Sequence, residues 1–353
     1  MRSIRGVTWV GLGILLGLSF SVCYRALANR GLGPGHSARP TSDSPTAGES
    51  GPGGHGRNPE PTLPAELQDF PTRCRQLGVL VCQGFDSPAD FIKADWPGTG
   101  LYPAWDKVMR GVQDTQVKAS GASSLRFEIP EYSGPNASGY WRQFIGRSFG
   151  EHSTFYVQFR QRFSPEMLTN SWGGETSWKQ VIIHGPESTC ADVEITTHNH
   201  NRWGTPTIYT DCGERGLYTE LDKKTPNPNS RPPYLLQQGN FACKWTDTFP
   251  VGNCFRYPVN QWVTFYYQIS IGDWGRPNSS IKAWVALEGQ PYKQWVNVNG
   301  YALYNKEPGT NDYSYVTLLD YMTNKNARVS GGPTAYTWYD ELIVSTQPIA
   351  APK

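Results

Sequence analysis

The segment Thr154–Phe163 constrains the fold most, because apolar and polar side chains alternate along it. A period of two is that of a β-strand with one buried face, and it does not fit a helix. The apolar face carries Phe155, Val157, Phe159 and Phe163, and the polar face carries Tyr156, Gln158, Arg160 and Arg162. The segment therefore predicts a strand that packs against a second layer.

Seven further segments have a strand-like composition, and clusters of Gly, Pro, Asn and Asp separate them. They are Ser124–Ile129, Trp178–His184, Asp192–His198, Trp262–Ile271, Ile281–Leu287, Tyr313–Tyr321 and Tyr336–Ser345. Only short helices are expected, at Pro88–Ile92 and Pro165–Leu168. This spacing predicts an all-β sandwich. The sequence has no Gly-x-Gly-x-x-Gly or Walker pattern, which argues against a nucleotide-binding α/β enzyme.

The first 28 residues have the form of an export signal. Arg2 and Arg5 precede the uncharged run Gly6–Val22, and Ala26-Leu27-Ala28 offers a small-x-small cleavage site. The run is also at the lower limit of length for a membrane-spanning helix. We therefore expect residues 1–28 to be a signal peptide or a membrane anchor, and the protein to be secreted or held in the cell envelope.

Residues 29–72 are rich in Gly, Pro, Ser and Thr and have hardly any large apolar side chains. Such a segment cannot bury enough surface to offset the entropy of ordering. We expect it to be a disordered N-terminal tether, and residues 73–353 to form the folded domain.

Six of the seven cysteines fall in this domain. In an exported chain an even number favours disulfides over metal thiolates, and the absence of a Cys-x2-Cys pair disfavours zinc. Pairing of sequential neighbours predicts Cys74–Cys82, Cys190–Cys212 and Cys243–Cys254.

Charge is balanced, with 32 Lys and Arg against 30 Asp and Glu. No global field therefore favours nucleic acid or an anionic membrane surface, and nucleic acid is not an expected partner. Any partner has to be inferred from local sites.

Two strand candidates carry several ionisable side chains. Strict alternation in Trp178–His184 places Gln180, Ile182 and His184 on one face and Lys179, Val181 and Ile183 on the other. In Asp192–His198, one side carries Asp192, Glu194, Thr196 and His198, and the chain continues into Asn199 and His200. A His-x-His pair can bind a metal, but no third ligand is evident, so no metal site is predicted.

Four segments carry a resemblance to a known group: Ser123–Phe127, Phe155–Phe163, Trp178–Ile183 and Tyr336–Ser345. They are similar to exported bacterial proteins with the concanavalin-like jelly-roll fold, which alginate, glucuronan and heparin lyases share. The similarity covers the chain from Val79 to Ile349. The resemblance implies a jelly-roll domain that acts on an anionic polysaccharide.

The resemblance also implies site residues. Jelly-roll lyases present a Gln-x-His stretch on a concave-face strand, with an Arg and a Tyr from neighbouring strands. Here Ile182-Ile183-His184 matches in the His and not in the Gln, and Gln180 could replace the missing glutamine. Candidates for the tyrosine are Tyr209, Tyr266 and Tyr339.

Cleavage of a uronate polymer by β-elimination needs a base, a group that neutralises the carboxylate and a proton donor for the leaving oxygen. We predict His184 as the base, Arg160 and Gln180 at the carboxylate, and Tyr209 as the donor; no cofactor is needed. Further substrate contacts are predicted for Gln158, Arg162, Lys179, Glu194, His198, Asn199, Tyr266 and Tyr339.

Two other functions fit parts of the sequence. Hydrolysis needs two carboxylates; Asp192 and Glu194 share a face, whereas Asp340 and Glu341 are expected on opposite faces. A non-catalytic binding module would use aromatic side chains to stack on sugars, with Trp172, Trp203, Trp274 and Trp295 as candidates. The row of Arg160 and Arg162 could also be an outer face in water.

Overall fold

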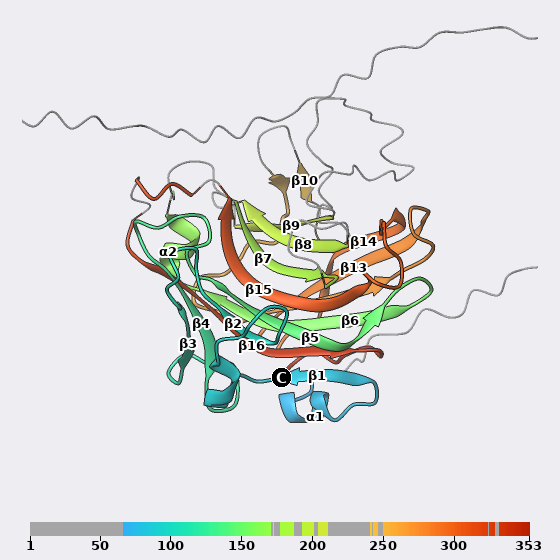
Figure 1. The fold of residues 1–353 in the computed structure, drawn as a ribbon, viewed down its shortest axis with the longest axis horizontal. Helices are drawn as coiled ribbons and strands as arrows, with labels where there is room; N and C mark the ends of the chain where they lie inside the picture. The colour runs from blue at the N-terminus through green and yellow to red at the C-terminus, as the bar shows by residue number, and fades with distance from the viewer. Residues whose placement is uncertain are drawn as a thin grey trace, which may run out of the picture. The chain divides into compact units, whose positions relative to one another are not determined.

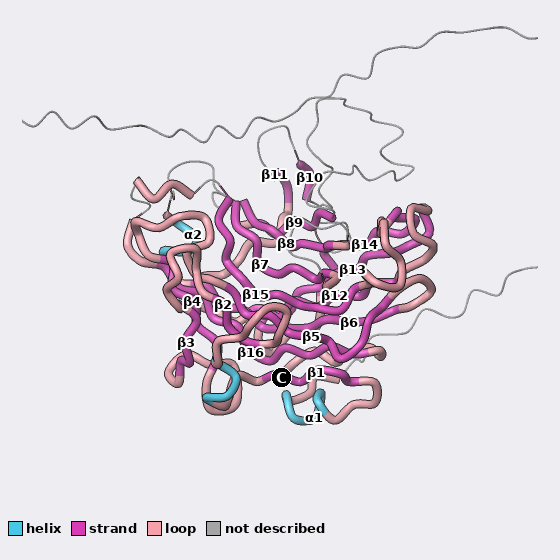
Figure 2. The backbone as a smooth tube through the Cα atoms, viewed as in Figure 1, coloured by secondary structure: helices cyan, strands magenta, loops and turns pink. Residues whose placement is uncertain are grey.

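A computed structural model describes residues 66–170, 172, 177–186, 193–200, 204–210, 241, 243–245, 250–323, 325–328 and 332–353. The chain divides into two units, Met1–Asn58 and Pro59–Lys353, and all of these residues belong to the second. Strands dominate it, and the helices are short (Figures 1 and 2). The second unit is an all-β jelly-roll sandwich, as the sequence predicts.

The larger sheet has eight strands in the order β14-β13-β12-β6-β16-β4-β3, and β1 pairs with β16 along the same edge as β4. Its strands are β1 (Val79–Gln83), β3 (Gly111–Asp114), β4 (Ser124–Ile129), β6 (Thr154–Phe163), β12 (Val263–Ser270), β13 (Pro277–Leu287), β14 (Lys293–Ala302) and β16 (Ala335–Ser345).

The smaller sheet has six strands in the order β2-β5-β15-β7-β8-β9. They are β2 (Gly100–Tyr102), β5 (Tyr140–Phe149), β15 (Tyr313–Thr323), β7 (Ser177–His184), β8 (Glu194–His200) and β9 (Thr205–Thr210). A separate ribbon pairs β10 (Cys243–Trp245) with β11 (Pro250–Gly252). The helical segments are α1 (Phe70–Cys74), the 3-10 turn η1 (Pro88–Phe91) and α2 (Pro165–Thr169).

The core lies between the two sheets and follows the alternation of β6. Phe155, Val157, Phe159 and Phe163 are fully buried in it, and Phe159 packs on Phe265 of β12 at 5.5 Å between ring centroids. Burial of these large apolar side chains supplies most of the free energy that holds the two sheets together. All eight predicted strands exist, and those of β4 and β6 have the predicted bounds.

The outer face of the larger sheet is also covered. We call residues 66–83 the N-terminal strap; it contains α1 and β1. A second apolar cluster lies on this face, where Tyr156, Tyr266, Trp284 and Ile343 pack with Ile349 of the C-terminal segment. The backbone of Gln68 pairs with Ala351 and Lys353. The described residues 66–72 thus pack on the domain, although the sequence assigns them to the linker.

Two of the predicted disulfides are present. Cys74–Cys82 closes the strap between α1 and β1, and Cys243–Cys254 joins β10 to the residues after β11. Cys190 and Cys212 lie outside the described residues, so their pairing stays a prediction.

No helix in the described ranges is long and apolar enough to cross a membrane. The predicted signal or anchor, residues 1–28, falls outside those ranges and stays a prediction.

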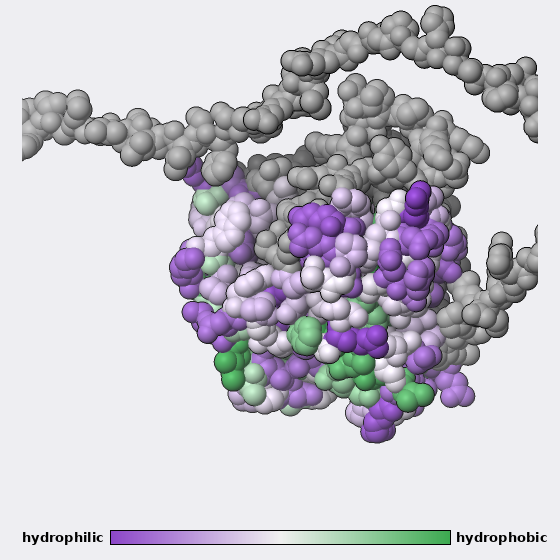
Figure 3. All heavy atoms as spheres, turned by 45° about the vertical axis from the view of Figure 1, so that its right-hand side comes forward, coloured by the Kyte–Doolittle hydropathy of each residue, from purple (hydrophilic) through white to green (hydrophobic). Residues whose placement is uncertain are grey.

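The smaller sheet is strongly curved. In Figure 1, β15 bends into an arc whose hollow side faces away from the larger sheet, and β7 and β8 follow it. We call this hollow surface the concave face. The view in Figure 3 shows a surface that is mostly hydrophilic or intermediate, with small separate hydrophobic patches in its lower part.

Candidate functional site

The predicted carboxylate-binding residues of β6 do not lie on the concave face. Gln158, Arg160 and Arg162 project from the outer face of the larger sheet, on the far side of the core from His184. Gln158 accepts a hydrogen bond from Arg73 and donates to Tyr292 and to the Ala350 carbonyl.

Arg160 is held in an ion network of the same face. Its guanidinium lies 3.0 Å from Glu288 and 3.5 Å from Glu341, while Arg162 lies over the ring of Trp338. The expectation that Arg160 and His184 share one site is therefore wrong. The strap reaches this face through Arg73, which binds Gln158 and Glu341, so the polar residues of this network serve structure.

Two predicted tyrosines are structural as well. The hydroxyl of Tyr266 accepts a hydrogen bond from the backbone of Ile349 under the C-terminal segment. Tyr339 lies in the core and donates to the carbonyls of Gln180 and Leu319. Neither hydroxyl reaches the concave face.

A β-bulge in β7 changes the face of Gln180. The register with β8 and β15 shifts between Lys179 and Val181, so Gln180 turns into the core. Its Oε1 accepts from Tyr257 at 2.8 Å and from Asn199 at 3.5 Å, and Asn199 is fully buried there. The predicted pairing of Gln180 with His184 is wrong, because strict alternation ignores the extra residue of a bulge.

The same bulge brings Lys179 to the concave face, where it pairs with His198 of β8 and Tyr321 of β15. Strict alternation predicts Lys179 and His184 on different faces of β7, and the bulge puts both on the concave face.

A second bulge, in β16, corrects the expectation for Asp340 and Glu341. The register shifts between Asp340 and Ile343, Glu341 takes a φ of 52°, and both carboxylates point to the outer face. Asp340 accepts from the backbone of Ala119 and Ser120, and burial raises the pKa of its carboxyl to about 8. These acids are committed to structural contacts. Asp192, the other hydrolase candidate, lies outside the described residues.

The register of the smaller sheet arranges the side chains of the concave face in rows that run across the strands. One row runs from Arg142 of β5 through Thr317, Ile182 and Thr196 to Tyr209 of β9. The neighbouring row contains Phe144, Tyr315, His184 and Glu194.

The first cluster gathers around Tyr315. The guanidinium of Arg142 lies 3.6 Å from the centroid of the Tyr315 ring and, on its other side, 3.6 Å from that of Trp96. The imidazole of His184 stacks on the same tyrosine at 5.8 Å. Arg142 and His184 are at most 1 % exposed. Three adjacent strands thus bring a cation, a phenol and an imidazole together.

The hydrogen bonds of His184 define its protonation. Nδ1 lies 2.7 Å from the Gly185 carbonyl oxygen, which can only accept, so Nδ1 carries the proton. Nε2 lies 2.8 Å from the hydroxyl of Thr317, and in a neutral ring with Nδ1 protonated it is the nitrogen that can accept a proton. A histidine held in this tautomer can accept a proton at Nε2.

The side chain of Arg142 is a buried cation. It donates through Nη2 to the Pro186 carbonyl at 3.2 Å, whereas Nε and Nη1 make no hydrogen bond to a described atom. Burial lowers the pKa of the guanidinium, and the phenols of Tyr315 and Tyr102 oppose that shift. Each of these two donors can give a charge-assisted hydrogen bond to a carboxylate oxygen.

The second cluster surrounds Lys179. Its Nζ lies 3.8 Å from Glu194, which accepts a hydrogen bond from Thr196 at 2.6 Å. The rings of Tyr209 and Tyr321 flank the ammonium at 5.8 and 5.7 Å. His198 contacts Tyr209 edge-on and Thr207 through Nδ1. The structure therefore brings together the predicted residues Lys179, Glu194, His198 and Tyr209.

Exposed aromatic side chains border the concave face on the side of β2 and β5. Trp96, Trp105 and Phe144 are 48, 61 and 42 % exposed. Trp172 and Trp295, by contrast, are fully buried in the core, Trp274 packs partly against it, and Trp203 lies outside the described residues. The available aromatic surface is therefore not where the sequence predicts it.

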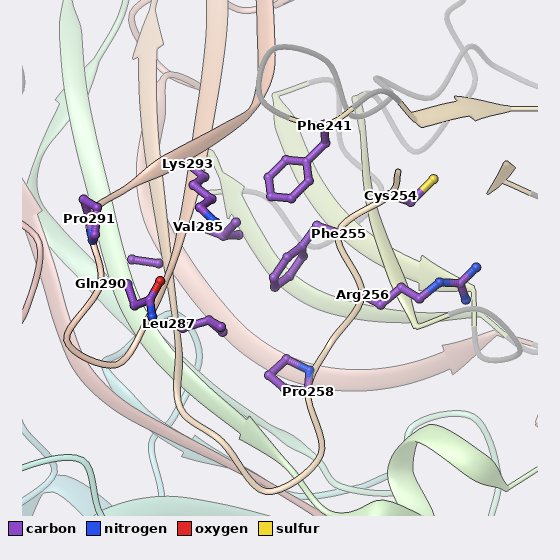
Figure 4. A pocket seen from close by; sticks show the side chains of 11 residues that line it. Phe241, Cys254, Phe255, Arg256, Pro258, Val285, Leu287, Gln290, Pro291 and Lys293 are labelled. Atoms are coloured by element: carbon purple, nitrogen blue, oxygen red, sulfur yellow. The ribbon is translucent and has the colours of Figure 1, made fainter. Parts of the chain in front are cut away.

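A cavity of about 260 Å³ lies elsewhere, between the hairpin of β13 and β14 and the residues after β11 (Figure 4). The rings of Phe241 and Phe255 project into it. Arg256 and Lys293 are its charged lining residues, and none of its described lining residues is a His, Tyr, Asp or Glu. It lacks a group that could act as a base near neutral pH, so the concave face is the better candidate site.

The sequence offered weak signals for Arg142 and Tyr315. Tyr140, Arg142 and Phe144 alternate with Trp141 and Ile145, but the polar stretch Gly146–Ser148 interrupts the alternation in the second half of β5. Tyr315 lies inside a predicted strand, and only its neighbours across the sheet identify it as a site residue.

No family model and no curated protein matches the sequence. Similar solved structures include an alginate lyase from Aplysia kurodai, with a TM-score of 0.49 and 11 % identity over 75 % of this chain and 98 % of that one. A glucuronan lyase from Trichoderma reesei has a TM-score of 0.44 and 13 % identity over 70 % and 94 % of the two chains. An alginate lyase from a Chlorella virus has a TM-score of 0.39 and 10 % identity over 67 % and 90 %. Function does not follow from likeness at this level and has to be inferred from the site.

Proposed function

We propose that the concave face cleaves a uronate-containing polysaccharide by β-elimination. The observation that carries the proposal is the meeting of Arg142 and His184 on the two sides of Tyr315, from the adjacent strands β5, β7 and β15. This set contains one group for each of the three requirements of the reaction.

Arg142 neutralises the uronate carboxylate. Abstraction of the neighbouring proton puts negative charge on that carboxylate, and a guanidinium already fixed between Trp96 and Tyr315 stabilises it without reorganising. Its burial strengthens the interaction, because little water screens it.

His184 takes the proton at Nε2 once the hydroxyl of Thr317 turns away. The electron pair of the broken C–H bond forms the new C=C bond, and the glycosidic C–O bond breaks. The leaving oxygen takes a proton from the hydroxyl of Tyr315, which His184 later restores. The step needs no oxidant and no cofactor.

Lys179 extends the positive charge of the face toward β9. It binds the carboxylate of a neighbouring sugar, with Tyr209 and Tyr321 beside it. Thus the catalytic residues of this proposal are Arg142, His184 and Tyr315, and Lys179 binds substrate.

The test is a panel of alginate, glucuronan, pectate and glycosaminoglycans, followed by the ultraviolet absorbance of the unsaturated product. His184→Gln should lower kcat about 10²–10⁴-fold, the usual contribution of a general base. The matched control is His152→Gln, because His152 is exposed and pairs only loosely with Asp273. Activity that survives His184→Gln would overturn the assignment of the base.

Arg142→Gln should lower kcat about 10²–10³-fold, as the loss of one electrostatic stabiliser does. Arg147→Gln is the control on the same strand, because Arg147 is exposed and, among the described residues, lies over the ring of Phe149.

A non-catalytic binding module is the second candidate. The exposed rings of Trp96 and Trp105 favour it, because a sugar can reach them directly, whereas Arg142 and His184 are at most 1 % exposed. This candidate predicts that a panel polymer binds to the protein and is recovered uncut. That result would replace the lyase proposal.

A further inference from the structure

Two exposed tryptophans mark the edge of the concave face, and the proposed reaction uses only Trp96, whose ring fixes Arg142. Trp105 is 61 % exposed and meets the ring of Tyr321 edge-on at 5.7 Å. Trp96 is 48 % exposed and lies over Arg142. Tryptophan is enriched at binding surfaces, where its large ring packs on a partner.

Each tryptophan is linked to a buried cation. Arg142 lies directly under Trp96, and Lys179 lies 5.7 Å from the ring of Tyr321, which Trp105 also contacts. An aromatic surface backed by positive charge suits a ligand that has apolar faces and negative charges together.

The two cations lie on the strands that flank β15. Arg142 of β5 pairs with Thr317, and Lys179 of β7 pairs with Tyr321, four residues further along β15. At the rise of a β-strand, Thr317 and Tyr321 are at most about 13 Å apart. An extended chain of sugars that follows β15 would pass both cations.

We propose that Trp96 and Trp105 form a two-tryptophan platform that binds pyranose rings of an acidic polysaccharide beside the reacting sugar. The ring faces stack on the indoles, and the carboxylates point toward Arg142 and Lys179. The position of the reacting sugar rests on the proposed function, whereas the binding of the polymer does not.

The first experiment measures binding by titration calorimetry with the panel polymers, in a His184→Gln background that prevents cleavage. Trp105→Ala should weaken binding about two- to tenfold, the value of one aromatic contact, and Trp96→Ala should do the same. Trp105→Phe keeps an aromatic ring and should restore most of the affinity.

The control is Tyr132→Ala, which removes another exposed aromatic side chain, 64 % exposed and outside the platform. Equal binding by the parent and both Trp→Ala variants would overturn the platform, and so would an equal loss in Tyr132→Ala. A parent that binds no panel polymer would overturn it too.

The second experiment separates the platform from catalysis, in protein with His184 intact. Trp105→Ala should raise KM for the polymer two- to tenfold and leave kcat unchanged. A fall in kcat without a change in KM would overturn the platform. Binding that depends on the tryptophans, in a protein that releases no unsaturated product, would support the platform and overturn the lyase proposal.

Discussion

At the scale of single residues, burial decides which ionisable groups shape stability. Asp320 is fully buried in β15, and neither carboxylate oxygen has a hydrogen-bond partner in the part of the chain that the structure describes. Burial raises the pKa of this carboxyl well above its ordinary value. The folded state therefore holds the Asp320 proton more tightly than the unfolded chain does.

We predict that Asp320→Asn stabilises the protein at pH 7. Between the unfolded pKa of about 3.9 and the raised folded pKa, stability falls as pH rises, because folding must keep or regain a proton. Asparagine removes this dependence, so the gain should be on the order of 1–3 kcal/mol at pH 7 and should vanish near pH 4. Urea unfolding at both pH values measures it.

Asp106→Asn is the control of opposite sign. Its hydrogen bond with Arg110 lowers the pKa of Asp106, so the substitution should cost at most about 1 kcal/mol, in full above about pH 4 and progressively less below it. Asp340, whose carboxyl pKa burial raises to about 8, will leave part of the pH dependence in both variants. An equal loss of stability in Asp320→Asn at both pH values would contradict the prediction.

At the scale of elements, the N-terminal strap is fastened to the larger sheet by a buried ion pair. The guanidinium of Arg73 is fully buried and pairs with Glu341, which Arg160 also contacts. Glu341 sits in the bulge of β16 with a φ of 52°, an uncommon conformation for a residue with a side chain. The Arg73–Glu341 ion pair and the β16 bulge that presents Glu341 together fix the position of the strap on the larger sheet.

Arg73→Met should destabilise the protein by about 3–5 kcal/mol, because it leaves the Glu341 carboxylate buried without one of its two cations. The double variant Arg73→Met with Glu341→Gln should recover part of that loss. Arg126→Met is the matched control, because Arg126 pairs with Asp114 at a partly exposed position and should cost less than about 1 kcal/mol. Thermal or urea unfolding measures the loss of stability in each variant. Equal losses in Arg73→Met and Arg126→Met would refute the role of the buried pair.

The disulfides belong to the same scale. We expect a thiol titration of the denatured, unreduced protein to find Cys74, Cys82, Cys243 and Cys254 blocked. Replacement of Cys74 and Cys82 by Ser should cost about 2–4 kcal/mol, mainly through a less constrained unfolded chain. Reactive thiols at these four positions would contradict the assignment.

At the scale of the whole molecule, the strap determines where the domain can be cut. A protein that starts at Glu66 keeps the Gln68 pairing with Ala351, the Arg73 ion pair and the Cys74–Cys82 bond. We predict that it unfolds in one cooperative transition. A protein that starts at Gln76 loses all three and should be less stable by more than about 3 kcal/mol. A common melting temperature for the two would show that the strap contributes nothing.

Much of the fold could be predicted because alternation is a local property. One face of β6 carries four large apolar side chains, and only burial of that face removes them from water. They are Phe155, Val157, Phe159 and Phe163. Sequential cysteines likewise meet wherever a short turn closes the chain, as at Cys74 and Cys82. These features need no knowledge of distant residues.

Only the tertiary structure decided which polar face is the site. Alternation puts Arg160 on the opposite side from Phe159, but there Arg160 is buried in ion pairs with Glu288 and Glu341. Arg142, in contrast, lies on the concave face of a sheet that the sequence only partly revealed. The bulges that turned Gln180 inward and Lys179 outward depend on hydrogen bonds to β8 and β15. Register between strands is set by partners far away in the sequence, so no local pattern can specify it.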